Sequence, residues 1–129
     1  MRLSMDEWEL TPARSAVALA SRVAGLEPPL DTVWVHFRDA DGLKKSSERA
    51  RDLGFQGKLC IHPDQVAPVN AAFTPSDDEV AKAQKIVVAF EKAEAEGSAS
   101  ITVDGFFVDY PVVDQARRTL ELIKRIRGG

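Results

Sequence analysis

Residues 54–73, GFQGKLCIHPDQVAPVNAAF, decide the fold. An apolar strand, predicted over 58–61, leads into His62-Pro63 and then directly into a helix predicted over 63–72. Proline is favoured in the first turn of a helix, and Asp64 is favoured near the positive end of the helix dipole. In α/β proteins, ligands bind where a strand ends and a helix begins, because free N–H groups point into the crevice there. The stretch therefore predicts a ligand-binding loop.

The residues upstream predict the same alternation of helix and strand. Residues 12–24 have helical spacing, and 32–37, TVWVHF, are apolar at nearly every position, as in a strand buried on both faces of a parallel sheet. A second helix is predicted over 43–53, and Gly54-Phe55 predicts a left-handed C-cap with an apolar contact. The order helix–strand–helix–strand–helix is typical of α/β architecture. The first helix is expected to bury Ala16, Leu19, Ala20 and Val23.

The second part of the chain has a different order of predicted elements. Ser76 and Glu79 form a capping-box pattern that opens a long helix, about 77–95. Asp104-Gly105, between two short β-rich runs, is a strong hairpin signal, and residues 111–127 predict a last amphipathic helix. We expect one domain over 1–75 and another segment over 76–129. The expected buried stripes are Val80, Ala83, Val87 and Phe90, and then Val112, Ala116, Leu120 and Ile123.

Length and charge exclude several classes of protein. The 129 residues suffice for an ordinary core but not for a complete (β/α)8 barrel, which needs roughly 200 residues or more. The net charge of −3 argues against broad nucleic-acid binding, and a late basic cluster around Arg117 and Arg125 favours a solvated helix face over an anion site. One cysteine excludes an internal disulfide. Without a long apolar run or a signal-peptide core, we expect a cytoplasmic protein with no membrane span.

A zinc site is disfavoured. Cys60, His62 and His36 are too few ligands at a recognisable spacing. Cys60 is expected to pack as a small apolar group, and a Cys60–His62 nucleophile pair is also disfavoured. We therefore predict no metal ligands in this sequence.

Five segments, in matching order and spacing, carry a resemblance to a known family. They are TPARS at 11–15 with Ala24-Gly25, RDADGL at 38–43, GFQGK at 54–58 with IHPDQ at 61–65, Val69-Asn70 with FTPS at 73–76, and VDG at 103–105 with VDYP at 108–111. Together they resemble the C-terminal part of the citrate lyase β-subunit-like (HpcH/HpaI aldolase) family of CoA-ester lyases.

The resemblance implies a fold. The chain would be an α/β fragment: the last two βα units of a (β/α)8 TIM barrel, followed by a helix–hairpin–helix lid. It also implies a homo-oligomer, similar to a trimer, in which the lid acts on the neighbouring subunit.

The resemblance also implies a chemistry. Family members cleave or form a carbon–carbon bond next to a CoA thioester of the citryl, malyl or β-methylmalyl type, usually with Mg²⁺, and some hydrolyse the thioester. Their metal-binding Glu and Asp come from earlier strands, which this sequence lacks, so we expect the isolated chain to be inactive.

Asp109 is the catalytic candidate. By resemblance, the lid carries an acid/base carboxylate that reaches a neighbouring active site. From the residues alone, Asp109 caps the helix that begins near Pro111. The two roles are compatible, and both stay open.

The binding candidates surround the loop after the second strand. By resemblance, Ile61, His62 and Pro63 line the groove for CoA, with open helix N–H groups attracting a phosphate. The Lys58 side chain either binds a phosphate or is solvated. The Gln65 side chain either binds the ligand or faces water. The His62 side chain has the alternative of packing within the loop. Asp39 and Asp41 follow the first strand, and Asp41 is the preferred N-cap of the next helix.

Three functions fit these expectations. The chain is part of a lyase, a CoA-thioester binding or regulatory module without catalysis, or a structural association domain. Unpaired strand edges and apolar faces predict association, at least to a dimer.

Overall fold

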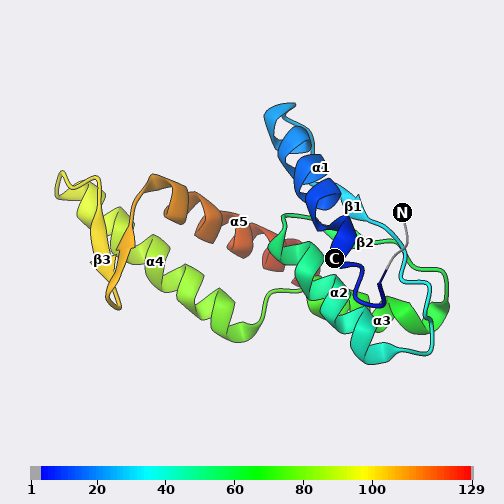
Figure 1. The fold of residues 1–129 in the computed structure, drawn as a ribbon. Coiled ribbons are helices and arrows are strands. Elements are labelled where there is room, and N and C mark those ends of the chain that lie inside the picture. The colour runs from blue at the N-terminus through cyan, green and yellow to red at the C-terminus, as the bar shows by residue number, and fades with distance from the viewer. Residues whose placement is uncertain (1–3, 129) are drawn as a thin grey trace. The chain divides into compact units, whose positions relative to one another are not determined.

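The computed structural model describes residues 4–128, which form two compact units (Figure 1). The first unit ends at Phe73 and the second begins at Thr74. None of the described helices is both long and apolar enough to cross a membrane.

The first unit has the predicted alternation of helix and strand. Its two strands pair in parallel, with Leu30 opposite Gly57 and Asp31 opposite Lys58. The predicted order of helix, strand, helix, strand and helix is confirmed. The elements are η1 (Trp8–Leu10), α1 (Thr11–Val23), β1 (Leu30–Asp31), α2 (Ala40–Asp52), β2 (Gly57–Lys58), η2 (Pro63–Gln65) and α3 (Val66–Phe73).

Both strands are shorter than predicted. Among the described residues of the first unit, only Leu30–Asp31 and Gly57–Lys58 form a ladder, so the strand predicted over 32–37 is wrong. In that segment Trp34 is buried, whereas Val35 is 58% exposed and Phe37 is 48% exposed. The reason is that the length of a strand depends on pairing with its neighbours, and within residues 4–128 β1 pairs only with β2.

Helix α1 buries a different face from the predicted one. Its only buried residue is Arg14, while Leu19 is 65% exposed and Val23 is 86% exposed. Arg14 bonds to Asp31 and Glu7, and these contacts turn the side of α1 that carries the arginine inward. The predicted apolar stripe is therefore wrong.

Helix α2 begins one turn earlier than predicted because Asp39 caps it. The Gly42 N–H donates to the Asp39 carboxylate at 2.9 Å, so the preference for Asp41 as the cap is wrong. The end of α2 is confirmed: Gly54 has φ +98°, and the Phe55 N–H reaches back to Ala50 O at 3.1 Å. The core of this unit comprises Trp34, Leu43 and Val69, with Phe73 packed against them.

The second unit consists of a helix, a hairpin and a helix, as predicted. They are α4 (Asp77–Ala95), β3 (Ile101–Val103), β4 (Phe106–Val108) and α5 (Tyr110–Arg127). The Ser76–Glu79 capping box makes both of its reciprocal bonds. The strands are antiparallel, and Asp104 and Gly105 have φ +51° and +80°, which is the backbone that a two-residue hairpin turn requires.

The core of the second unit lies between α4, α5 and the hairpin. Phe90 and Val113 are fully buried, and Val108 is 1% exposed. The predicted stripes are right for most positions. Ile86 is buried where Val87 was expected, and Val113 is buried where Val112 was expected, because the hairpin packs against one side of each helix.

Candidate functional site

The loops that follow β1 and β2 lie next to each other, since parallel strands bring their carboxyl ends to the same edge. Gln65 joins them. Its side chain is 1% exposed. Its Nε2 donates to Trp34 O at 2.9 Å, and its Oε1 accepts from the Ile61 N–H at 2.9 Å. The sequence left open whether Gln65 binds a ligand or faces water; the structure buries it between the two loops.

An exposed aromatic surface lies beside this contact. The Phe37 and His62 rings stack with centroids 5.4 Å apart and planes at 22°. The Arg38 guanidinium carbon lies 5.3 Å from the Phe37 centroid. We call Phe37, Arg38 and His62 the aromatic shelf. Phe37 is 48% exposed and the neighbouring Ile61 is 55% exposed, so the shelf offers flat, accessible surface for stacking.

The backbone N–H groups at this turn are already bonded. The Asp64 N–H donates to His62 Nδ1 at 3.2 Å, and the Gln65 N–H donates to His62 O at 3.0 Å. Pro63 has no N–H group. The prediction that open N–H groups at this helix start attract a phosphate is therefore wrong.

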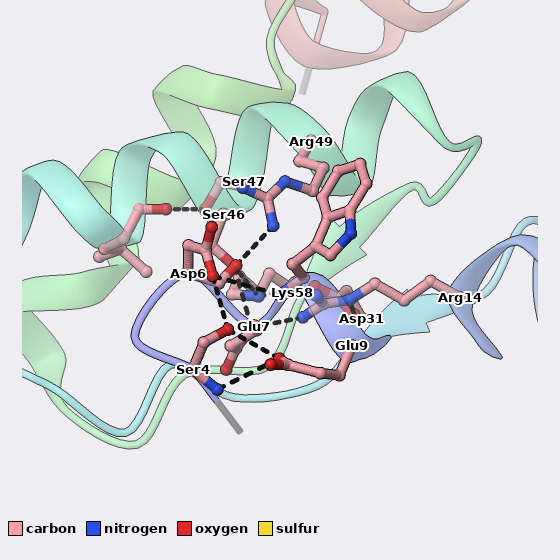
Figure 2. A network of polar contacts seen from close by, with 12 residues as sticks. Ser4, Asp6, Glu7, Glu9, Arg14, Asp31, Ser46, Ser47, Arg49 and Lys58 are labelled. Atoms are coloured by element: carbon pink, nitrogen blue, oxygen red, sulfur yellow. Dashed lines mark hydrogen bonds and ion pairs between the residues drawn. The ribbon is translucent and has the colours of Figure 1, made fainter. Parts of the chain in front are cut away.

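Lys58 lies in a buried ion network, seen in Figure 2. Its ammonium lies 2.6 Å from Asp31 Oδ2 and 3.0 Å from Ser46 Oγ, and its side chain is fully buried. Arg14 binds the other oxygen of Asp31 at 2.7 Å and Glu7 Oε2 at 2.7 Å. Lys58 therefore presents no exposed ammonium to a phosphate. We use the term ion network for Glu7, Arg14, Asp31, Ser46 and Lys58.

Opposite charges balance inside the ion network. Burial alone would raise the pKa of Asp31, but hydrogen bonds from Arg14 and Lys58, with the charges of both, outweigh burial and lower this pKa. For Arg14, burial opposes the charged form, and the bonds to Asp31 and Glu7 outweigh it, so the pKa of Arg14 is raised. The backbone of Glu7 itself is in the left-handed conformation, with φ +53°.

Sequence reasoning missed Arg14, Asp31 and Glu7. Charged residues at the ends of helices and strands are usually solvated, so each has an ordinary interpretation when read singly. The available signal was their position: Asp31 directly precedes an apolar run, and Arg14 lies in a helix that is otherwise rich in apolar residues. Their partners follow only from the packing of α1 and α2 beside the strands.

Asp109 lies in the second unit, where it caps α5. Its Oδ1 accepts from the Val112 N–H at 3.4 Å. The next residue, Tyr110, packs edge-on against Phe90 and donates its hydroxyl to Glu94 at 3.0 Å. This bond to Glu94 raises the pKa of Tyr110. The capping role predicted for Asp109 is confirmed, and the carboxylate retains a second oxygen for other contacts.

The described residues do not form a magnesium site. Between Ser4 and Gly128, no three or more His, Cys, Asp or Glu side chains are grouped so as to hold a metal. The Cys60 side chain is exposed. The expectation that it packs as a small apolar group is wrong, because the chain leaves the sheet after Lys58.

Known proteins are similar in sequence to this chain over most of its length. It is 33% identical over 122 residues to the mitochondrial citramalyl-CoA lyase of Rattus norvegicus, covering 95% of the chain and 36% of the relative. It is 43% identical over 102 residues to the (3S)-malyl-CoA thioesterase of Cereibacter sphaeroides strain KD131, covering 79% of the chain and 35% of the relative. The chain thus spans little more than a third of these curated relatives.

A solved structure shares the fold. It is the protein CitE from Mycobacterium tuberculosis in complex with magnesium, acetoacetate and coenzyme A, with a TM-score of 0.76 and 29% identity. The match covers 87% of this chain and 40% of that one. The sequence model of HpcH/HpaI aldolase/citrate lyase matches residues 1–63. In sequence and in fold, the chain is therefore similar to the C-terminal part of proteins of the HpcH/HpaI aldolase/citrate lyase type.

Proposed function

We propose that this chain forms the C-terminal part of a Mg²⁺-dependent carbon–carbon lyase that acts on CoA thioesters of the citryl, malyl or β-methylmalyl type. In this proposal the first unit supplies the last two βα units of a TIM barrel, and the second supplies the lid. The aromatic shelf carries the proposal, because it is exposed at the carboxyl ends of parallel strands, where barrel enzymes bind substrates. The CitE structure, with coenzyme A bound, supports the ligand class.

The shelf and the loop after β2 are assigned to the CoA groove. Stacking on His62 or Phe37 suits the planar base of CoA, and Arg38 gives the shelf a cation for the CoA phosphates. Ile61 and Pro63 add apolar surface to the same loop. Lys58 has no part in this groove, since it is buried in the ion network.

Asp109 is assigned the acid/base step. A protonated carboxyl group here gives its proton to the α-carbon of an acyl-CoA enolate, forms the C–H bond, and is left as a carboxylate. When bound, Mg²⁺ supplies polarisation of the substrate oxygen. Because the described residues do not fit a magnesium site, we assign its ligands to residues other than 4–128 and derive no step through the metal.

A chimera tests the proposal. This chain replaces the matching third of the rat citramalyl-CoA lyase, and cleavage of citramalyl-CoA is followed by chromatography of the CoA esters. We expect cleavage that needs Mg²⁺. In the chimera carrying Asp109→Asn, turnover should fall by about 100-fold or more, with CoA affinity changed less than about threefold. Equal turnover in the two chimeras would remove Asp109 from the mechanism.

The alternative is a CoA-thioester binding or regulatory module without catalysis. In its favour, the shelf is formed entirely by residues of this chain, so stacking needs no other subunit. A folded chimera that binds CoA and cleaves no thioester would support this alternative. A chimera that neither binds nor cleaves would exclude both.

A further inference from the structure

The buried amide of Gln65 contacts both loops that border the aromatic shelf. We propose that Gln65 is a positioning residue that sets the spacing of these loops, and therefore of the shelf, for a CoA thioester. The inference rests on the proposed function, because it takes the shelf to be the CoA-facing surface. At 1% exposure Gln65 has almost no surface left for a ligand, so it acts through its neighbours.

The two hydrogen bonds reach the backbone close to each ring of the shelf. Trp34, whose carbonyl accepts from Nε2, precedes Phe37 by three residues, and Ile61, whose N–H binds Oε1, directly precedes His62. The Gln65 backbone N–H also donates to His62 O at 3.0 Å. Gln65 therefore bonds to both segments that carry the stacked rings of Phe37 and His62, whose centroids lie 5.4 Å apart.

The geometry requires a group that donates at one end and accepts at the other. A glutamine amide does both. A carboxylate only accepts, so Gln65→Glu places an anion against the Trp34 carbonyl. Protonation restores a donor, and burial raises the pKa of such a carboxyl group. Gln65→Met retains the approximate length of the side chain and loses both bonds at every pH.

The test is CoA affinity of the full 129-residue chain, measured by titration of amide NMR signals. At about pH 8, both Gln65→Met and Gln65→Glu should bind CoA about tenfold more weakly than the wild type, the effect of losing buried hydrogen bonds. At about pH 5.5, Gln65→Glu should recover most of the loss and Gln65→Met should not. Each variant is compared with the wild type at the same pH.

Val69→Ala is the matched control. Val69 is 5% exposed in the same core as Trp34 and Leu43, so truncating it destabilises the unit and leaves the Gln65 bonds in place. Its CoA affinity should stay within about twofold of the wild type. The inference is overturned if Gln65→Met binds like the wild type, if Gln65→Glu shows no recovery at acidic pH, or if Val69→Ala weakens binding as much as Gln65→Met.

Hydrogen exchange separates this inference from the proposed function. If the wild type binds no CoA, the proposed function fails. The rate of hydrogen exchange at the Ile61 amide then tests the role of Gln65 independently of CoA binding. In Gln65→Met its exchange should accelerate about tenfold more than that of the Leu53 amide, which is bonded to Arg49 O. Equal acceleration at both amides would mean that Gln65 only adds general stability.

Discussion

Asp31 determines the arrangement of the ion network. It is 2% exposed, and each of its oxygens binds a different cation, Arg14 at 2.7 Å and Lys58 at 2.6 Å. Removing one member of a buried ion pair leaves the partner charge without compensation, which costs more than the pair contributes when complete. The network therefore makes the first unit sensitive to single substitutions.

Asp31→Asn should lower the free energy of unfolding by about 3–5 kcal/mol. The asparagine keeps the size of the side chain, but Arg14 and Lys58 then share a buried site with Glu7 as the only anion of the network. Urea unfolding measures the change. The control is Glu48→Gln, which removes an exposed pair with Lys44 at 3.9 Å and should cost less than about 1 kcal/mol. Similar losses in the two variants would contradict the assigned role of Asp31.

Acid should weaken the wild type through the same carboxylate. In the unfolded chain Asp31 titrates near 3.8, and in the folded protein its pKa is lower. Its contribution is therefore complete above the unfolded value and is lost as the pH falls from about 4 through the folded pKa. Between about pH 5 and pH 2, stability should fall more steeply in the wild type than in Asp31→Asn. Parallel curves would show that Asp31 does not carry this dependence.

Single residues show where sequence reasoning reaches its limit. The cap at Asp109 was predictable, because a cap depends on residues within one turn. The partners of Lys58 and Gln65 were not, because Asp31 and Trp34 lie 27 and 31 positions away. Polar side chains at such distances meet only after the strands have paired.

Among the elements, the hairpin turn is the one most completely specified by its sequence. Asp104 and Gly105 both have positive φ, and a side chain at Gly105 would be strained at φ +80° although no atom lies within 4 Å of the added carbon. The strain therefore comes from the backbone alone.

Gly105→Ala should destabilise the second unit by about 1 kcal/mol. Asp104→Asn is the control, because asparagine tolerates positive φ and the change removes only an exposed ion pair with Lys85. Thermal unfolding followed by circular dichroism compares the two. A midpoint for Gly105→Ala equal to that of the wild type would contradict the turn geometry.

The capping box gives a second prediction for an element. Ser76 accepts from the Glu79 N–H at 3.2 Å and its own N–H donates back to the Glu79 carboxylate at 2.8 Å. Ser76→Ala should cost about 1 kcal/mol of the stability of α4. Ser76→Asp, which keeps an acceptor at the cap, should cost much less. An equal loss in both variants would exclude capping as the cause.

Elements with local signals were predictable, and those that depend on neighbours were not. Helix α4 was predicted with the observed bounds and the hairpin with the observed turn, since caps and turns lie within a few residues. The strand over 32–37 failed because strand length depends on pairing with other segments. The buried face of α1 failed because hydrophobic periodicity does not anticipate a buried arginine.

At the scale of the whole molecule, exposed apolar side chains predict association. Leu19, Val23 and Leu26 are 65–86% exposed, and in the hairpin Phe106 and Phe107 are 63% and 66% exposed. Within the described residues, β1 and β2 pair only with each other, so each retains an unpaired edge. We expect at least a dimer in sedimentation velocity at micromolar concentration. A strictly monomeric, cooperatively folding species would be inconsistent with this prediction.

The central claim is that the loop after β2 and the aromatic shelf belong to a CoA-binding groove. The most direct measurement is titration of the ¹⁵N-labelled chain with CoA, followed by amide chemical shifts. We predict saturable shifts centred on Phe37, Arg38, Ile61 and His62, with little change in the hairpin turn at Asp104-Gly105. If CoA produces no saturable shifts, or if the shifts centre on residues away from the shelf, the proposed groove is contradicted.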